Sequence, residues 1–477
     1  MIFKIGVISA YALMVIIVGV LGMRKTHSFV DFFLGGRSVG PWMTAFTYGT
    51  AYFSAVLFIG FAGKIGWGFG LSGLWIMVGN TLIGVLGVWW LLGPRIKAMS
   101  VEYDVHTMAE YLEKRYGSPF LKLFSAGSIF IFFIPYTAAV FMGLSYLFQS
   151  NFNMPYSATL IYMGLFTAIY LVLGGYKSMT MIDVAFGVIM IAGVVILDIY
   201  TLRAGHGLSG IISQLEAIDP KLTQAVGPPG FWSLFCLVFL TSIAPFAMPQ
   251  LVQKFYAIRD KRSIHIGMFG STIFGVICVG TAYFTGAAAR IFLNSETAPG
   301  AFVDGKPVFD ALMPEFIANV IPPSLSVLIL LLILAASMST LAALVLISSS
   351  SLAKDVYAGF ISRNASDSRL TSLMRMSSAF FVFLSVILAY MKPATIVAIL
   401  GISWGAIGSV FLGPFIWGLF TKWTNKAGAV SSSVLGLAVC LLLYASGSSS
   451  PEAGTIGMMV SLAVNPLVSL ATGGLKE

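Results

Sequence analysis

The sequence predicts an all-α polytopic membrane protein with about thirteen transmembrane helices, and two observations carry this prediction. First, 58% of the 477 residues are hydrophobic, only 9% are charged and the mean hydropathy is +0.93, whereas soluble proteins carry about 25% charged residues. Second, apolar runs of about 20 residues follow one another, which is the length at which a helix crosses the hydrocarbon and satisfies its own backbone hydrogen bonds. Barrel strands of about 10 residues would be much shorter.

The predicted crossings form a single membrane unit over residues 1–477, because no soluble domain or linker interrupts them. The first crossing is followed at once by Met23-Arg24-Lys25 without a small-residue cleavage site, so it is expected to be a retained helix. The thirteen crossings are expected near residues 5–23, 41–65, 72–95, 121–149, 156–175, 180–202, 230–253, 266–290, 323–353, 373–391, 394–420, 427–446 and 454–473.

The net charge of +9 raises the question of nucleic-acid binding, and the position of the charges argues against it. With the amino terminus outside, twenty of the 27 Lys and Arg residues fall in or near inner loops and seven remain on the outer side. This is the positive-inside bias. We therefore expect a multi-pass protein of the plasma (inner) membrane, embedded in the lipid bilayer, with an outside amino terminus, a cytoplasmic carboxyl terminus and no nucleic-acid partner.

Cysteine and histidine usage indicates neither a disulfide nor a metal or catalytic centre. Cys236, Cys278 and Cys440 lie within predicted helices, where a thiol behaves as a small hydrophobe. The four histidines fall in or beside loops, without metal-ligand spacing. An enzyme would be expected to cluster ionisable residues in the helices, and only Asp183 and Asp198 fall there. The sequence therefore does not predict an enzyme.

Two predicted crossings contain polar or proline breaks at mid-depth. The second reads AFTYGTAYFSAVLFIGFAG over 45–63, and the seventh reads FLTSIAPFAMPQLVQKF over 239–255. Such breaks are the sequence pointer to transporters built from inverted repeats. Since they lie five crossings apart, we expect a first repeat at 41–202, a second at 230–420 and peripheral helices at 1–40 and 421–477. The alternative is that both are ordinary kinks absorbed by neighbouring helices.

The ninth crossing is rich in hydroxyls and reads LLILAASMSTLAALVLISSSS over 331–351. Ser348 to Ser351 run around the helix and are expected to bond its own carbonyls. Ala336, Ser339 and Thr340 instead share one face, because they stand at i, i+3 and i+4. Together with carbonyls from the broken second crossing, they would present about five neutral oxygens, which suit a monovalent cation that must also leave again. The pattern therefore predicts a Na⁺ site.

Several separated stretches resemble the sodium/solute symporter family, most closely its sodium/proline symporter branch. The resemblance implies a leucine-transporter-like fold of five plus five inverted helices. It also implies Na⁺-coupled symport of a small polar organic solute, an amino acid or a carboxylate, into the cell by alternating access. The stretches are VDFFLGGRSVGPW at 30–42, TYGTAYFSA at 47–55, LGGYKSMTMIDV at 173–184, AASMST at 335–340 and ILGISWGAIGSVFLGPF at 399–415.

The resemblance also implies roles for single residues. Asp183 matches a family carboxylate on the Na⁺ release path, and a carboxylate within a membrane helix is functional by default; the alternative is a solvated interfacial position paired with Lys177. Arg37 matches a family arginine of the first inner loop. The implied Na⁺ ligands are the backbone carbonyls of Thr50, Phe53 and Ala336 and the hydroxyls of Ser339 and Thr340.

The candidate substrate residues are polar or aromatic side chains at mid-depth, which a small solute needs among apolar walls. They are Tyr52, Ser54, Tyr136, Thr241, Ser403 and Trp404. Tyr52 stands where sodium/proline symporters carry an aspartate, and Thr241 and Pro245 stand where they carry aromatic cavity residues, which speaks against proline as the solute.

Two further alternatives stay open from the sequence. Lys64, about one turn from the outer end of its helix, either snorkels to the interface or helps to hold an anionic substrate group. The alternative to Na⁺ coupling is a proton-coupled or uncoupled transporter of the same fold, with Asp183 as the proton carrier.

Overall fold

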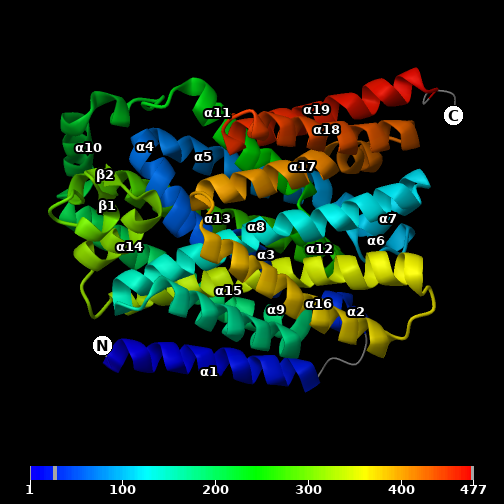
Figure 1. Cartoon of the computed structure of the whole chain (residues 1–477), viewed down its shortest axis with the longest axis horizontal. Helices are drawn as coiled ribbons and strands as arrows, with labels where there is room; N and C mark the ends of the chain where they lie inside the picture. The colour runs from blue at the N-terminus through cyan, green and yellow to red at the C-terminus, as the bar shows by residue number, and fades with distance from the viewer. Residues whose placement is uncertain (1, 25–28, 474–477) are drawn as a thin grey trace.

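A computed structural model describes residues 2–24 and 29–473, apart from the side chains at positions 2, 23, 29, 170–174 and 177. Long helices run side by side along the long axis of the molecule, and the two ends of the chain lie at opposite ends of that axis (Figure 1). This arrangement is expected when an odd number of crossings joins the two termini.

The first part of the chain contains the first broken helix. Its elements are α1 (Ile2–Arg24), α2 (Phe29–Leu34), the 3-10 turn η1 (Gly35–Arg37), α3 (Pro41–Tyr52), the π-type η2 (Val56–Gly66), α4 (Trp67–Phe69), the 3-10 turn η3 (Gly70–Gly73), α5 (Leu74–Gly79), the π-type η4 (Asn80–Leu92), α6 (Gly93–Glu102), α7 (Met108–Tyr116), α8 (Pro119–Phe152), α9 (Tyr156–Ala204), α10 (Gly207–Ile218) and the 3-10 turn η5 (Pro220–Thr223).

The second part contains the second broken helix and one short hairpin. Its elements are α11 (Phe231–Ile243), the 3-10 turn η6 (Ala244–Ala247), α12 (Pro249–Ala257), α13 (Lys261–Phe292), the 3-10 turn η7 (Pro299–Ala301), β1 (Phe302–Val303), β2 (Lys306–Pro307), α14 (Phe309–Val320), α15 (Ser326–Ser350), the π-type η8 (Ser351–Ile361), α16 (Asp367–Met391), α17 (Ile396–Phe420), α18 (Lys426–Ala445) and α19 (Ser450–Ala471).

The number of crossings agrees with the sequence once two long helical stretches are divided. By length and composition, the described residues contain ten helices able to cross a membrane, or eleven with the bent pair α11–α12. One of them, 56–102, holds the second half of the predicted crossing 41–65 and the whole of 72–95, and it turns at Gly70 (φ 61°, ψ −141°). Likewise, α9 turns at Gly175 (φ 61°), and its first half contributes only a shorter apolar helix, Tyr156–Ile169. Dividing both stretches gives thirteen.

Both predicted breaks are present. After α3, Phe53 is extended (φ −110°, ψ 132°), and the helix resumes in η2. After α11, the chain passes through η6 and an extended Met248 (φ −79°, ψ 115°) before Pro249 begins α12, and the two helices meet at 41°. The second break follows from local chemistry, because Pro245 and Pro249 cannot donate the hydrogen bonds that would continue the helix. The first break, at Phe53, contains no proline.

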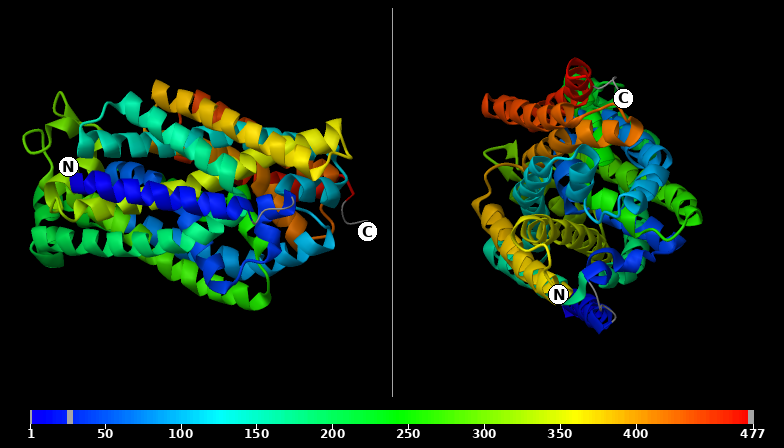
Figure 2. Two further views of the ribbon diagram at one scale, coloured as in Figure 1. Left: turned by 90° about the horizontal axis from the view of Figure 1, so that it is seen from below. Right: turned by 90° about the vertical axis from the view of Figure 1, so that its right-hand side faces the viewer.

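Helix α15 lies at the centre of the bundle and packs against α9, α8, α3 and α16. Every residue from Ile329 to Ser350 is buried. The peripheral helices lie at opposite edges: α1 packs on α9, and α18 and α19 pack on α17, as the side and end views agree (Figures 1 and 2). A helix that is apolar all round, like α15, is expected to be enclosed by other helices.

A two-stranded antiparallel hairpin interrupts the otherwise helical chain, with Phe302 opposite Pro307 and Val303 opposite Lys306. The all-α prediction missed it. Its two-residue turn is Asp304-Gly305, and both residues have positive φ (50° and 72°). Asp-Gly is a preferred pair for such turns, but two paired residues per strand are too few to leave an alternating pattern.

Candidate functional site

The hydroxyl of Thr340 lies at the break after α3. Its Oγ1 is 3.2 Å from the carbonyl oxygen of Ala51, 3.4 Å from that of Phe53 and 3.1 Å from that of Ala336, one turn earlier on α15. The oxygens of Phe53, Ala336 and Thr340 therefore converge as the sequence predicted. Ala51 is an addition that sequence reasoning missed, because the path of the chain at the break decides which carbonyls turn inward.

Ser339 connects this cluster to Asp183. Its Oγ is 2.8 Å from Asp183 Oδ1 and 3.0 Å from Thr50 Oγ1, and the Thr50 hydroxyl donates to the Phe46 carbonyl at 2.8 Å. Thr50 was expected to contribute its carbonyl, and its side chain is the part that contacts Ser339. The neighbouring Ser337 faces the other side of the break, where its Oγ accepts the backbone N–H of Ala55 at 3.0 Å.

Asp183 is buried inside the bundle on α9, with 0% of its surface exposed. The alternative of a solvated interfacial carboxylate is therefore wrong; the side chain of Lys177, its suggested partner, lies outside the described residues. Lys254 on α12 supplies a positive charge near Asp183. Its ammonium lies over the ring of Tyr176 at 4.8 Å from the centroid. Asp183 thus stands between the hydroxyl cluster and the second broken helix.

Ser349, Ser350 and Ser351 each donate a hydrogen bond to a carbonyl three or four residues earlier on α15, as expected from the sequence. Ser348 differs, since its buried Oγ has no partner among the described residues. Hydroxyls on one helix thus divide between local bonds and contacts with other elements.

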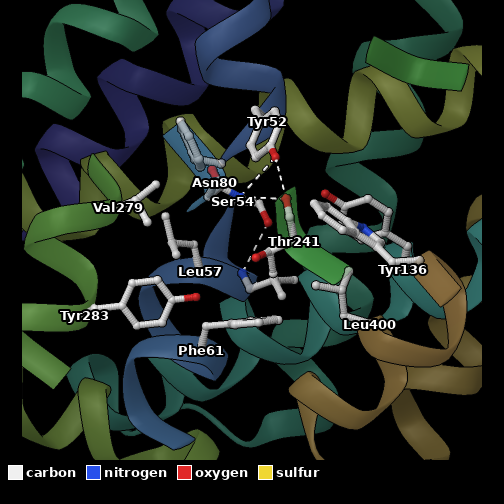
Figure 3. Close-up of a pocket in the computed structure, with 13 residues that line it drawn as sticks. Tyr52, Ser54, Leu57, Phe61, Asn80, Tyr136, Thr241, Val279, Tyr283 and Leu400 are labelled. Carbon is white, nitrogen blue, oxygen red and sulfur yellow. Dashed lines mark hydrogen bonds between the residues drawn. The ribbon is translucent and has the colours of Figure 1, made fainter. Parts of the chain in front are cut away.

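A small cavity, here called the central cavity, lies between the two broken helices (Figure 3). The space available to the centre of a water molecule is about 40 Å³, enough for a few waters. Five of the six predicted substrate residues line it: Tyr52, Ser54, Tyr136, Thr241 and Trp404, together with Phe53, Val56, Leu57, Phe61, Asn80, Val279, Tyr283 and Leu400.

Ser403 does not line the central cavity. Its hydroxyl donates to the carbonyl of Phe132 at 2.6 Å and so faces α8. The reason is geometric: successive residues of a helix point about 100° apart, so α17 cannot turn both Ser403 and Trp404 toward the same cavity. Mid-depth alone did not distinguish them.

Asn80 is a cavity residue that the sequence analysis missed. Its Nδ2 donates to the hydroxyl of Tyr52 and to the carbonyl of Thr241, both at 3.0 Å, and the Tyr52 hydroxyl donates to the same carbonyl at 3.1 Å (Figure 3). The sequence could have indicated this role, because an asparagine within an apolar crossing is expected to form a hydrogen bond with another helix. Asn80 joins the two broken helices across the cavity.

Two polar atoms in the lining of the central cavity remain available for hydrogen bonds to a solute. Asn80 Oδ1 and Trp404 Nε1 are buried without a partner among the described residues. The Trp404 ring stands edge-on to Tyr52 and to Tyr136, with centroids 6.1 Å and 6.0 Å apart. The cavity thus offers at least one acceptor, Asn80 Oδ1, and one donor, Trp404 Nε1, among aromatic walls, and none of its lining side chains is charged. Such a lining can orient a small polar solute.

A second cavity, the Lys64 cavity, lies one helical turn beyond the central one. It has a volume of about 440 Å³ and is lined by Lys64, Ile65, Leu237 and Val397, among others. The Lys64 ammonium is 3.4 Å from Thr395 Oγ1. Lys64 therefore lines a cavity between helices and is half-buried there.

Arg37 ties two loops together at the other end of the molecule. Its guanidinium donates to the carbonyl of Val105 at 2.9 Å and reaches that of Ser100 at 3.5 Å. The backbone at Gly35, Gly36 and Arg37 has positive φ, which two adjacent glycines favour. Arg37 thus holds the loop before α3 against the α6–α7 loop, far from the central cavity.

A helical membrane bundle with two broken helices, a cluster of neutral oxygens and an adjoining solute cavity defines a secondary transporter, and comparison with known proteins agrees. The family model described as the Sodium:solute symporter family matches residues 32–436. The chain belongs to this family. It is a Na⁺-coupled symporter and not an enzyme, and Na⁺ is the coupling ion of the family.

Relatives and solved structures agree with this membership. The chain is 27% identical to the osmoregulated proline transporter OpuE of Bacillus subtilis, over 97% of this chain and 93% of that one. It is 29% identical to the sodium/pantothenate symporter of Escherichia coli, over 90% and 87%. A Na⁺-coupled sialic acid symporter in a substrate-bound outward-open state superposes with a TM-score of 0.83 at 18% identity, over 98% and 97%.

The nucleobase-cation-symport-1 transporter Mhp1 superposes with a TM-score of 0.53 at 13% identity, over 93% and 95%. The two structural matches establish the leucine-transporter-like fold that the sequence resemblance implied.

Proposed function

We propose that the chain imports a small amino acid or carboxylate together with Na⁺ by alternating access. The observation that supports the proposal is that one residue at the first break, Phe53, belongs to both sites. Phe53 lines the central cavity, and its carbonyl oxygen lies 3.4 Å from the Thr340 hydroxyl. An ion drawn to this carbonyl would act on the wall of the solute cavity. Coupling of this kind is a difference in Na⁺ affinity between two conformations.

The residues present fit a Na⁺ ion at this break. The oxygen atoms around Thr340 that could act as ligands are uncharged. They are backbone carbonyls freed at the break and side-chain hydroxyls, which replace the water around the ion without binding it too tightly. The Ala51 carbonyl, 3.2 Å from the Thr340 hydroxyl, is a further candidate. We propose as ligands the carbonyls of Thr50, Phe53 and Ala336 and the hydroxyls of Ser339 and Thr340.

Asp183 is proposed to draw Na⁺ from this site toward the cytoplasm, because its carboxylate contacts Ser339 at 2.8 Å. The rival role, a proton carrier for a proton-coupled transporter, would use the same carboxylate. Membership of a Na⁺-coupled family favours the ion.

For the solute, we propose contacts with Tyr52, Ser54, Tyr136, Thr241 and Trp404 and with the unpartnered Asn80 Oδ1. None of the lining side chains is charged, so a carboxylate would depend on the partial positive charge at the amino end of a broken half-helix, as in other transporters of this kind. The named solutes of the relatives, proline and pantothenate, both carry a carboxylate, which supports this class. Tyr52 argues for a solute other than proline.

The Lys64 cavity is proposed to face the outside and the amino terminus to be external. The support is the concentration of Lys and Arg at the opposite end, as the positive-inside rule requires. Residues 41–202 and 230–420 are proposed as the two inverted repeats, since each begins with one of the broken helices, α3–η2 and α11–α12.

The proposal is tested by uptake of a panel of radiolabelled amino acids, carboxylates and sugars into proteoliposomes with and without an inward Na⁺ gradient. Ser339→Ala combined with Thr340→Ala is expected to lower Na⁺-driven uptake by about 100-fold or more, because two of five ligands are lost. Ser349→Ala is the matched control, since this buried serine of the same helix bonds only its own helix.

Three outcomes would contradict the proposal. Undiminished uptake in the double variant would remove the Na⁺ site. Uptake that ignores Na⁺ and follows a pH gradient would select proton coupling. Saturable uptake of sugars alone would reject the solute class.

A further inference from the structure

A third cavity lies at the Arg37 end of the molecule, where α7, α12 and the end of α15 meet. This Asp355 cavity has a volume of only about 10 Å³ and is lined by His106, Thr107, Met108, Ile129, Pro249, Gln253, Tyr256, Ile347, Ser350 and Asp355. It is separate from the central cavity, with which it shares no lining residue. Its volume corresponds to one water molecule or one small ion.

Three buried oxygens of this lining have no hydrogen-bond partner among the described residues. They are Gln253 Oε1, the Tyr256 hydroxyl and Asp355 Oδ2, and each of these residues is only 1% exposed. The amide of Gln253 is oriented, because its Nε2 donates to the Phe33 carbonyl at 2.8 Å and leaves the oxygen as the free end. Buried polar atoms are nearly always satisfied, so three free oxygens around one cavity indicate a ligand.

The ligand must also balance the negative charge of the Asp355 carboxylate. Asp355 Oδ1 accepts a hydrogen bond from Thr107 Oγ1 at 2.6 Å, but no basic group of the described residues lies within 4.0 Å of this carboxylate. A buried carboxylate without a counter-ion is strongly unfavourable. A water molecule could satisfy the three oxygens but would bring no positive charge.

The basic groups around the cavity already face other carboxylates. Glu110 accepts the backbone N–H groups of His106 and Thr107 at 2.8 Å and 3.3 Å and lies 3.6 Å from the Lys354 ammonium. Burial raises the pKa of Glu110, but the hydrogen bonds from His106 and the charge of Lys354 lower it to about 2. Lys122 pairs with Glu113 at 2.7 Å. The positive charges therefore balance the two glutamates and leave Asp355 without a close ion partner.

We propose that the Asp355 cavity binds a monovalent cation, Na⁺, on the route between the Thr340 cluster and the cytoplasm. The ion identity rests on the proposed function, which makes Na⁺ the ion that leaves on this side. Asp355 lies fifteen positions after Thr340 along α15 and η8, or about 22 Å at 1.5 Å per residue. Bound Na⁺ joins α7, α12 and η8, so cytoplasmic Na⁺ holds this side closed and inhibits inward transport.

The first test is the internal Na⁺ concentration that halves uptake into proteoliposomes at fixed external Na⁺. Asp355→Asn, which keeps the shape but removes the charge, is expected to raise this concentration about tenfold. Tyr256→Phe removes one neutral oxygen and is expected to raise it about threefold. Glu102→Gln, an exposed carboxylate on the same side, is the matched control and should leave it unchanged.

A second measurement separates this proposal from the proposed function. Equilibrium binding of radioactive Na⁺ to the purified protein should lose one class of site in Asp355→Asn and a different class in the Ser339→Ala, Thr340→Ala double variant. Unchanged internal inhibition and unchanged Na⁺ binding in Asp355→Asn would overturn the Asp355 site, whatever the double variant does. An effect of Asp355→Asn that follows internal pH and not internal Na⁺ would also overturn it, in favour of a proton.

Discussion

The two ends of the proposed transport route are closed by different chemistry. On one side of the central cavity, the Lys64 cavity of about 440 Å³ is separated from it by about one turn of apolar side chains, among them Phe61 and Leu400. On the other side, the Asp355 cavity measures about 10 Å³. Its walls are held by Thr107 against Asp355 and by Lys354 against Glu110.

This difference indicates which interactions must be lost when each side opens. Opening toward Lys64 requires the separation of apolar contacts, which are weak one by one and not directional. Opening toward Asp355 requires the loss of hydrogen bonds to buried charges, each worth about 1.5–3 kcal/mol. The structure therefore favours the arrangement that opens first toward Lys64. In the proposed orientation this is the outer side, where a symporter waits for its ion and solute.

The substitution with the largest expected effect is Glu110→Gln, which tests whether ionic contacts close the Asp355 side. Removing the charge weakens the contacts with Lys354 and with the α7 amino end, so the Asp355 side should open about 10- to 100-fold more often. The measurement is the labelling rate of Ser350→Cys, a buried lining residue, by a membrane-impermeant maleimide from that side. Glu113→Gln is the matched control, because Glu113 pairs within the α7–α8 unit. Equal rates in the two variants would reject an ionic closure.

A smaller effect is expected from Phe61→Ala on the apolar side. Shortening this side chain thins the layer between the Lys64 cavity and the central cavity, and Thr241→Cys should react with an impermeant thiol reagent from the Lys64 side about tenfold faster. The three native cysteines are buried, so their background is low. Leu13→Ala, an exposed residue of the peripheral α1, serves as the control. An unchanged rate would place the barrier elsewhere.

The smallest expected effect sharpens the role of Lys64. If its ammonium attracts a solute carboxylate on entry, Lys64→Met should raise KM for the carboxylate solute about threefold and leave kcat unchanged, since the residue is outside the central cavity. The effect should shrink at high ionic strength, where a partly exposed charge is screened. A KM that stays at the wild-type value at low salt would return Lys64 to a structural role.

Much of the fold could be predicted because its determinants are local. The second break follows from Pro245 and Pro249, which cannot continue a helix, and the first was marked by polar residues in the middle of an apolar crossing. The shared face of Ala336, Ser339 and Thr340 follows from the helical period. The carboxylate of Asp183 was recognisable because a charge within a membrane helix needs a reason. Each of these signals is contained within a few neighbouring residues of the sequence.

Only the tertiary structure decided which distant groups meet. Thr340 reaches the carbonyl of Ala51 across 289 positions, Asn80 bridges Tyr52 and Thr241, and Ser403 turns to α8 while Trp404 faces the cavity. These outcomes depend on how each helix is rotated about its axis when it packs, and the sequence of one helix does not contain that rotation. The amino-acid sequence by itself determined where helices run, break and carry hydroxyls. The packing of the bundle determined which oxygens converge and left the buried carboxylate of Asp355 without an ion pair among the described residues.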